Sequence, residues 1–514
     1  MLVTIALPSL ALPGDAGTAT HQRHKTGKYA RRHEHRATSV AINGPVYKGP
    51  PVLAQPAIPA CSRESALRIS KTYNLKGWDI PTPNFGNSIT QDYDCWRTNL
   101  AEKYGISIMA YNTGQLYSNL INHYVPPSGT QQYAGQRATG AYYTALYATY
   151  DLSRWGIPDG QFQLGGFTTN STYIKFQPNN SNLLYLAYYQ TFFNRMFEVN
   201  VGYIPLNNVF VGTQVGGNVF NILGANATLP VLTGASNFGD PTPAAIVKWN
   251  LPDHFYDKAG IARSAATTVA VNQNLSPVQA ENYSNPASIK FTNAPYVFGV
   301  QYPTERPLYI NEIGYKNDAA PNDPATWVRF TSFYNSSDYN DLAHSGHNQV
   351  NDYALLLYGD RQIWQTNFSS PGTAYQGVYV GGTVAYASPY ASSISQDYQF
   401  RLYEFGMFNR PFDQLSFIYE HETYSHFLAN SADAAASCLS GTSCFRHGLN
   451  QYTVVYNANI VPGVFLGMGV SYVDHPAAAW SPNGVAYGSA TAPVVPQLNI
   501  NHALNFLASA FINY

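Results

Sequence analysis

The sequence is poor in charge and contains no long apolar run. Lys, Arg, Asp and Glu make up 11% of its 514 residues, where an ordinary globular chain carries about 25%. No stretch reaches the roughly 18 consecutive apolar residues that a membrane-spanning helix requires. Aromatic residues reach 14%, which excludes a disordered chain, because such chains are rich in charge and poor in aromatics. A net charge of −1 gives no reason to expect nucleic acid as a partner.

Short segments with alternating apolar and polar residues take the place of apolar helices. In residues 197–203 every odd position is apolar and every even one is polar or glycine, and residues 452–460 nearly repeat this pattern. Residues 466–472 follow it too, and residues 504–514 carry their apolar side chains at even positions. One such segment also fits a soluble antiparallel sheet. Its recurrence in a chain with so few charges predicts an all-β fold, a transmembrane antiparallel β-barrel.

About sixteen strands are expected, an even number as in bacterial single-chain barrels. They are placed at residues 105–113, 139–151, 161–170, 182–192, 196–204, 244–251, 257–264, 307–316, 326–334, 351–363, 375–387, 397–408, 414–424, 450–461, 464–474 and 500–514. The barrel domain is therefore predicted to span residues 105–514.

Loop lengths predict which end of the barrel faces the periplasm. The turns after even-numbered strands include the short connections 193–195, 252–256, 409–413 and 462–463. The long connections, among them 114–138, 205–243, 265–306, 425–449 and 475–499, follow odd-numbered strands. Because periplasmic turns are short and external loops long, the N-terminus is expected on the periplasmic side of a bacterial outer membrane.

Three segments precede the predicted barrel. Residues 1–19 resemble part of an export signal, although no basic region precedes their apolar residues. Residues 20–74, basic and His-rich at first and then Pro-rich, are expected to form a flexible periplasmic lead-in. A basic, His-rich run could also bind metal or an anionic polymer, but a solvated lead-in is favoured. Residues 75–104 are expected to be a periplasmic segment with a short helix.

The four cysteines fall into two local pairs. Cys438 and Cys444 share a predicted external loop, and Cys61 and Cys95 both precede the first strand. An even number of cysteines in an exported chain predicts disulfides, with free thiols as the alternative. Metal ligation is not expected, since no histidines stand at zinc-finger spacing.

Several segments resemble the OprB-type carbohydrate-selective porins of Gram-negative outer membranes. Residues 94–106 are similar to that family's short helix before the first strand, and residues 151–160 to its first periplasmic turn. Residues 307–315 resemble its Glu-containing strand, and Arg410 to Asp413 resemble its Arg-Pro-x-Asp turn. The resemblance runs from about residue 75 to the end. It implies a sixteen-stranded channel through which sugars diffuse, with outer-membrane lipid and lipopolysaccharide as neighbours and no cofactor or enzymatic activity. A homo-oligomer stays open.

Alternation places the charged strand residues inside the barrel, because a basic side chain facing lipid at the bilayer midplane costs about 2–4 kcal/mol. Glu312 and Lys316 share one face of their strand, and Trp327 and Arg329 share one face of the next. A short turn joins these strands, so Glu312 and Arg329 are expected to lie close and pair. Further lumen candidates are Lys175, Glu198, Lys248 and Arg401. Each can bind sugar hydroxyls or brace the wall, and for Arg401 bracing is favoured.

Other functions are weaker alternatives. An anion-selective pore needs a ladder of Lys and Arg, whereas the inward basic positions here are few and interleaved with Glu198 and Glu312. A general diffusion pore stays open. His421 and His426 mimic a zinc-protease motif, but they stand five apart on a predicted strand, where that motif needs one helical face. A barrel hydrolase and a plugged structural or export-associated barrel are more distant alternatives. No catalytic residue and no metal site is predicted.

Overall fold

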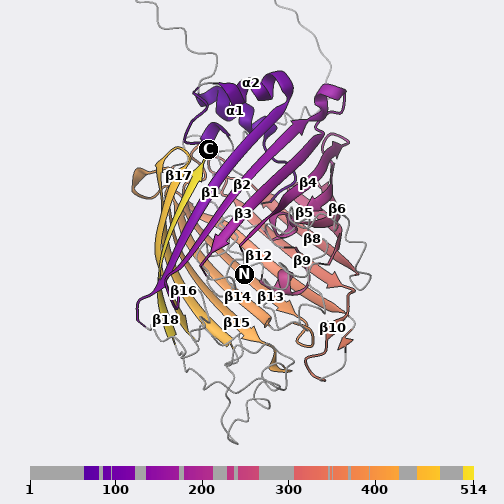
Figure 1. Cartoon of the computed structure of the whole chain (residues 1–514), viewed down its shortest axis with the longest axis vertical. Helices are drawn as coiled ribbons and strands as arrows, with labels where there is room; N and C mark the ends of the chain where they lie inside the picture. The colour runs from indigo at the N-terminus through magenta and orange to yellow at the C-terminus, as the bar shows by residue number, and fades with distance from the viewer. Residues whose placement is uncertain are drawn as a thin grey trace, which may run out of the picture.

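Strand pairing closes on itself in the computed structural model of this chain. The structure describes residues 63–79, 85–93, 95–121, 135–172, 179–211, 228–236, 241–264, 306–344, 348–349, 351–367, 372–392, 394–427, 448–474 and 502–514. Within this part of the chain, sixteen antiparallel strands follow one another around a barrel, and β1 and β18 pair to close it (Figure 1). The predicted fold class is confirmed.

The barrel strands are β1 (Ile106–Asn119), β2 (Thr139–Asp151), β3 (Gln161–Ser171), β4 (Asn180–Phe192), β5 (Phe197–Ile204), β6 (Thr242–Asn250), β7 (Phe255–Arg263), β8 (Pro307–Asn317), β9 (Thr326–Asn335), β12 (Asp352–Gln365), β13 (Gly377–Ala387), β14 (Ile394–Phe405), β15 (Gln414–Tyr424), β16 (Gly448–Val461), β17 (Val464–Asp474) and β18 (His502–Asn513). A separate hairpin pairs β10 (Tyr339–Asn340) with β11 (Asn348–Gln349). The helices are α1 (Arg63–Tyr73), α2 (Trp96–Tyr104), α3 (Asn207–Phe210), α4 (Thr228–Leu232) and the 3-10 turns η1 (Phe85–Asn87), η2 (Leu152–Trp155) and η4 (Met407–Asn409).

Each expected strand overlaps one strand of the barrel, with two informative shifts. β1 continues past its predicted end at residue 113, because Gln115, Tyr117 and Asn119 keep the inward alternation going beyond Gly114. β14 stops at Phe405 rather than at residue 408. Gly406 there adopts a φ of 84°, a left-handed conformation that suits glycine and turns the chain into η4.

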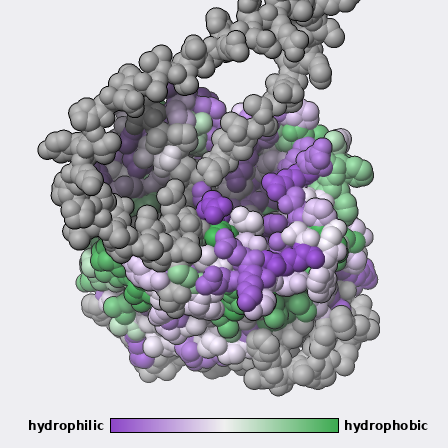
Figure 2. Space-filling model, turned by 90° about the horizontal axis from the view of Figure 1, so that it is seen from above, coloured by the Kyte–Doolittle hydropathy of each residue, from purple (hydrophilic) through white to green (hydrophobic). Residues whose placement is uncertain are grey.

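The alternation read from the sequence gives the two faces of the wall. In β17, Leu466, Met468 and Val470 are 39%, 61% and 42% exposed, whereas Ser471 and Val473 on the other face are buried. An apolar outer surface and a polar inner one are what a barrel in lipid requires. Viewed from the end that carries α1 and α2, hydrophilic residues gather over the end of the barrel and hydrophobic ones lie toward its sides (Figure 2).

The N-terminal helices lie at the end with the short turns, close to the C-terminal strand (Figure 1). The backbone N–H of Ile89 donates to the carbonyl of Asn513 at 2.8 Å. The Arg97 guanidinium on α2 donates to the carbonyl of Tyr514. Within the predicted lead-in, residues 63–73 form helix α1, and residues 1–62 lie outside the described part. None of the described helices is long and apolar enough to cross a membrane.

The connection between β5 and β6 departs from its expected place in an external loop. Phe210 on α3 is fully buried and contacts the inward-facing Phe333 of β9, with 6.5 Å between ring centroids. Val209 and Leu229 join the same apolar cluster with inward residues such as Ile310. Described parts of residues 205–243 therefore fold into the barrel, because their apolar side chains can be buried against its inner wall.

Candidate functional site

The hairpin of β8 and β9 brings the predicted Glu312 and Arg329 together inside the barrel. Glu312 stands opposite Thr331, and Arg329 stands opposite Gly314, so the two charged residues are diagonal neighbours. Arg329 Nε lies 3.9 Å from Glu312 Oε2, and Thr331 donates a hydrogen bond of 2.9 Å to the same oxygen. The expected ion pair across the hairpin is present. Both side chains are buried, Glu312 fully.

Two residues that sequence reasoning missed complete this group. Lys258 on β7 stands directly opposite Glu312, with its Nζ 3.0 Å from Glu312 Oε1. The same Nζ lies 2.8 Å from Asp79 Oδ2, and Arg329 Nη1 lies 3.3 Å from that oxygen. We refer to Asp79, Lys258, Glu312 and Arg329 as the central cluster. It holds two carboxylates and two cations, so its formal charge is zero.

Aromatic side chains surround the central cluster. The guanidinium carbon of Arg329 lies 3.9 Å from the ring centroid of Trp327, whose Nε1 donates to the Tyr256 hydroxyl at 3.0 Å. Tyr256 in turn donates to Glu312 Oε1 at 2.8 Å. Gly314 makes this possible, because a Cβ there would meet the Tyr256 ring at 2.4 Å. Lys316 lies beside the same indole ring, with its Nζ 4.4 Å from the Trp327 ring centroid. Cation–π contacts and hydrogen bonds thus fix the geometry of the cluster.

Glu198 and Lys248 form a second inward pair near the short-turn end. They stand opposite each other on β5 and β6, with 3.4 Å between Lys248 Nζ and Glu198 Oε1. Tyr189 and Asn250 each donate to the Glu198 carboxylate, at 2.8 and 2.7 Å. Their side chains are 19% (Glu198) and 31% (Lys248) exposed. Of the predicted charged pairs, this one is the most accessible.

Arg401 is enclosed in the wall, and its bracing role stays a prediction. Its side chain is fully buried, and its Nη2 lies 3.2 Å from Asp360 Oδ2. Tyr403 donates to the same carboxylate at 3.0 Å and faces inward with Arg401, which resolves the uncertain alternation at that position. Gly381 leaves the room that the Asp360 carboxylate occupies, since a Cβ there would lie 2.1 Å from Oδ1. This pair links β12 to β14.

Three carboxyl groups lie close together farther along the same wall. We refer to Asp397, Glu420 and Glu422 as the acidic cluster. Asp397 and Glu422 stand opposite each other on β14 and β15, and all three side chains are buried. Glu420 accepts a hydrogen bond of 2.6 Å from Gln399. Neither carboxylate oxygen of Asp397 or Glu422 has a hydrogen-bond partner in the described structure. No arrangement of three or more described His, Cys, Asp or Glu residues could hold a metal ion.

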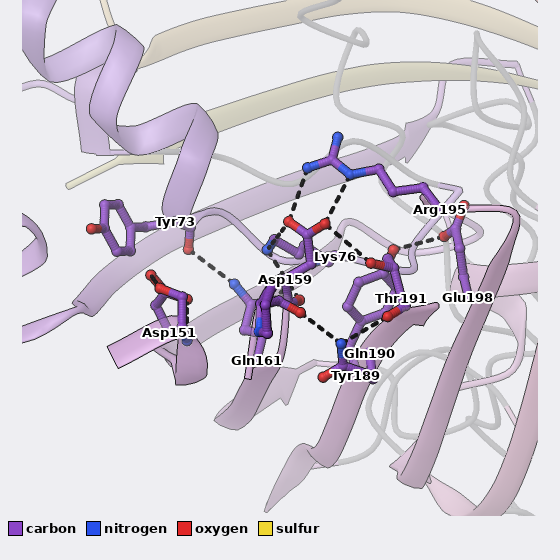
Figure 3. Close-up of polar contacts among 12 residues, drawn as sticks. Tyr73, Lys76, Asp151, Asp159, Gln161, Tyr189, Gln190, Thr191, Arg195 and Glu198 are labelled. Atoms are coloured by element: carbon purple, nitrogen blue, oxygen red, sulfur yellow. Dashed lines mark hydrogen bonds and ion pairs between the residues drawn. The ribbon is translucent and has the colours of Figure 1, made fainter. Parts of the chain in front are cut away.

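The chain from Tyr73 to Asp79, here called the strap, runs along the inner wall to the central cluster. Gln161 donates to the Tyr73 carbonyl at 3.4 Å (Figure 3). It also donates to the Asn74 carbonyl at 2.9 Å and accepts from the Lys76 N–H at 3.1 Å. Trp78 packs edge-on against Tyr185 of β4, with centroids 5.0 Å apart. The Asp79 N–H donates to the carbonyl of Asn208 at 2.9 Å. These contacts attach the strap to the wall at β3 and β4 and, at its end, to the loop that contains α3.

A charged network at the short turns anchors the strap. Asp159 accepts two hydrogen bonds from Arg195, at 2.9 and 3.0 Å, and its backbone carbonyl accepts one from Lys76 Nζ at 3.3 Å (Figure 3). The hydrogen bonds from Arg195 hold the pKa of the Asp159 carboxyl below its usual value. The same contact raises the pKa of Arg195, and burial lowers the pKa of Lys76.

Some sequence predictions fall outside what the structure describes. Lys175, Cys61, Cys438 and Cys444 lie outside the described residues, so the two disulfides stay predictions; of the four cysteines, Cys95 belongs to the described part of the chain. His421, the first residue of the protease-like motif, lies on a strand, and the residue after it, Glu422, points to the opposite face. Asp79 gave no sequence signal, since it belongs to no alternating segment. Lys258 was missed on the strand whose pattern is weakest, although it shares the parity of Tyr256 and Ala262.

Comparisons with known proteins are consistent with this geometry. The family model described as carbohydrate-selective porin, OprB family, matches residues 128–492. The high-pH structure of OprB from Pseudomonas putida aligns with 83% of this chain and 98% of its own, at a TM-score of 0.62 and 14% identity. An anion-selective porin from Comamonas acidovorans aligns over 80% of this chain and 99% of its own, at a TM-score of 0.44 and 9% identity. No curated protein matches.

Proposed function

Because this chain belongs to the OprB family of carbohydrate-selective porins, we propose that sugars diffuse through its barrel along the described polar inner wall. The proposal deepens the family assignment by naming the residues that a permeant meets. It places the protein in the outer membrane, with the helices α1 and α2 and the short turns on the periplasmic side. Sugars are the permeants, and lipid and lipopolysaccharide are the neighbours of the apolar outer surface.

The observation that carries the proposal is the chemistry of the accessible inner wall near the short turns. Glu198 and Lys248 are partly exposed there, and each is held by partners that leave further hydrogen-bonding capacity. A sugar hydroxyl is donor and acceptor at once, so a carboxylate beside an ammonium can replace part of its water shell. Glu312, Arg329 and Trp327, by contrast, are buried. We assign to them the role of stabilising the wall of the channel rather than binding the sugar.

An anion-selective pore is less well supported by the same wall. Lys248, Lys258, Arg329 and Arg401 each lie in an ion pair with a carboxylate. Paired cations present little net field to a passing anion, whereas selection for anions needs unbalanced positive charge along the path. A neutral permeant with many hydroxyls fits a wall of paired charges and aromatic rings better.

Single-channel recording in planar bilayers tests this proposal. Glucose or maltose should reduce the current in a saturating manner, because sugar binding in the path delays the ions. A polyethylene glycol of similar size is the control, since it excludes volume without matching the donors and acceptors. The double variant Glu198→Gln/Lys248→Gln removes both charges and should weaken the sugar block several-fold. Block by sugar and polymer that is equal at equal size would instead establish a general diffusion pore.

A further inference from the structure

We propose that Asp79, carried into the barrel by the strap, sets the charge selectivity of this channel by neutralising the positive charge that Glu312 leaves uncompensated on two cations of the wall. The inference rests on the proposed role as a channel, but not on sugar being the permeant. It concerns a residue outside every barrel strand, so the wall alone does not determine which ions pass.

The strands by themselves place an excess of positive charge at the central cluster. Lys258 and Arg329 both lie beside one strand carboxylate, Glu312, at 3.0 and 3.9 Å. Asp79 supplies the second carboxylate and is nearer to each cation than Glu312 is, at 2.8 and 3.3 Å. Two cations and one anion sum to +1, and Asp79 brings the sum to zero. Charges in such a poorly hydrated place act strongly on one another and on a nearby ion.

Asp79 is also the member of the cluster that solvent reaches. Its side chain is 17% exposed, while those of Lys258, Glu312 and Arg329 are 3%, 0% and 2% exposed. An ion in the lumen therefore meets a carboxylate, with the two cations behind it. Without that charge, the same ion would meet the net positive charge of Lys258, Arg329 and Glu312, which attracts anions.

The position of Asp79 does not depend on its charge alone. Trp78 is packed against Tyr185, and the Asp79 N–H is bonded to the Asn208 carbonyl. Gly77, with a φ of 79°, allows the strap to pass Tyr189 and Asn200 at distances that a Cβ would not permit. These neighbours should keep residue 79 in place when its carboxylate is replaced by an amide of the same shape.

The test is the chloride-over-potassium permeability ratio of the full-length protein in a planar bilayer with a KCl gradient. Asp79→Asn should raise this ratio several-fold, and Asp79→Glu should leave it near the wild-type value. Asp257→Asn is the matched control. Asp257 adjoins Lys258 but lies on the outer face, where it accepts a hydrogen bond of 2.8 Å from Asn311. This control removes the same charge from the other side of the wall and should not change the ratio.

If the uncompensated cation keeps Asp79→Asn from forming a folded barrel, a second variant removes a cation as well. Asp79→Asn/Lys258→Gln removes one charge of each sign, and its ratio should return toward that of the wild type. A ratio in Asp79→Asn no different from that in Asp257→Asn would overturn the inference, as would a double variant more anion-selective than the wild type. Sugar block is recorded in the same membranes. A shifted ion ratio in a channel that no sugar blocks would refute sugar permeation and leave the role of Asp79 intact.

Discussion

The central cluster and the acidic cluster are both groups of buried charged residues inside one barrel, but they are built differently. In the central cluster each carboxylate lies within 4 Å of a cation, and the partners come from the strap and from three strands. In the acidic cluster Asp397 and Glu422 face each other across two neighbouring strands without a described partner. Burying a charge is costly unless it is paired and hydrogen-bonded. The charges of the central cluster thus balance because an extra segment, the strap, adds Asp79 to it.

The largest effect should come from removing a shared cation of the central cluster. Lys258→Met leaves both Asp79 and Glu312 with one partner fewer in a buried place, and we expect a loss of about 3–5 kcal/mol in unfolding free energy. Urea unfolding of the barrel in detergent measures it. Asp257→Asn, next to it on the outer face, serves as the control. A loss below 1 kcal/mol, on the scale of a surface pair, would mean that the cluster is better hydrated than its burial indicates.

The pair of Arg401 and Asp360 is the next comparison, because it is paired like the central cluster but fully enclosed in the wall. Arg401→Met should lower the unfolding free energy by about 3 kcal/mol. The loss should not be larger, because Tyr403 still donates a hydrogen bond to Asp360. It should leave sugar block and ion selectivity unchanged, because neither residue reaches the lumen. Unfolding and single-channel recording on the same preparation check both parts. Altered sugar block in a stable Arg401→Met channel would place Arg401 on the path.

A change in the acidic cluster should raise the unfolding free energy rather than lower it. Glu422→Gln removes a buried carboxyl that has no described partner, so we expect a gain of about 1–3 kcal/mol in stability near neutral pH. Glu198→Gln is the contrasting variant, because Glu198 is held by Lys248, Tyr189 and Asn250 and should lose stability on the same change. Equal losses in both would remove the contrast between paired and unpaired carboxyls.

The smallest effect concerns pH at the anchor of the strap. Arg195 lowers the pKa of Asp159, so this contact stabilises the fold at pH values above the unfolded pKa of about 3.9. That contribution is lost as the pH falls through the lower folded pKa. The strap should therefore stay anchored at pH 5 and loosen only below pH ~4. The fluorescence of Trp78, taken as the difference between the wild type and Trp78→Phe, measures this loosening as the pH falls. Asp159→Asn should loosen the strap already at neutral pH.

The strands were predictable because lipid on one side and water on the other impose a period of two. That constraint placed Glu312, Arg329, Glu198, Lys248 and Arg401 on the inner face from parity alone, and the structure has them there. The closeness of Glu312 and Arg329 could also be predicted, because the turn between β8 and β9 is short. The odd or even position of a residue predicts the face on which it lies wherever one face of the strand contacts lipid.

The elements that fill the barrel were not predictable in the same way. The strap and the loop with α3 contact neither lipid nor bulk solvent on a regular period, so their sequences carry no alternation. Phe210 and Val209 looked like part of an external loop, and Asp79 looked like one charge in a linker. Their places depend on contacts far apart in the chain, such as that of Asp79 with Arg329. Apolar residues within a supposedly external loop are the signal that could have found α3.

The contact between Arg97 and Tyr514 has a consequence for how the barrel is assembled. Helix α2 leads directly into β1, and its guanidinium donates to the carbonyl of the residue after β18. The first and last strands pair with each other at the seam of the barrel. Helix α2 therefore ties the two sides of this seam together, since it is followed by β1 and is bonded to the residue after β18. It adds its contacts at the one junction of the described barrel that hairpins between consecutive strands do not make.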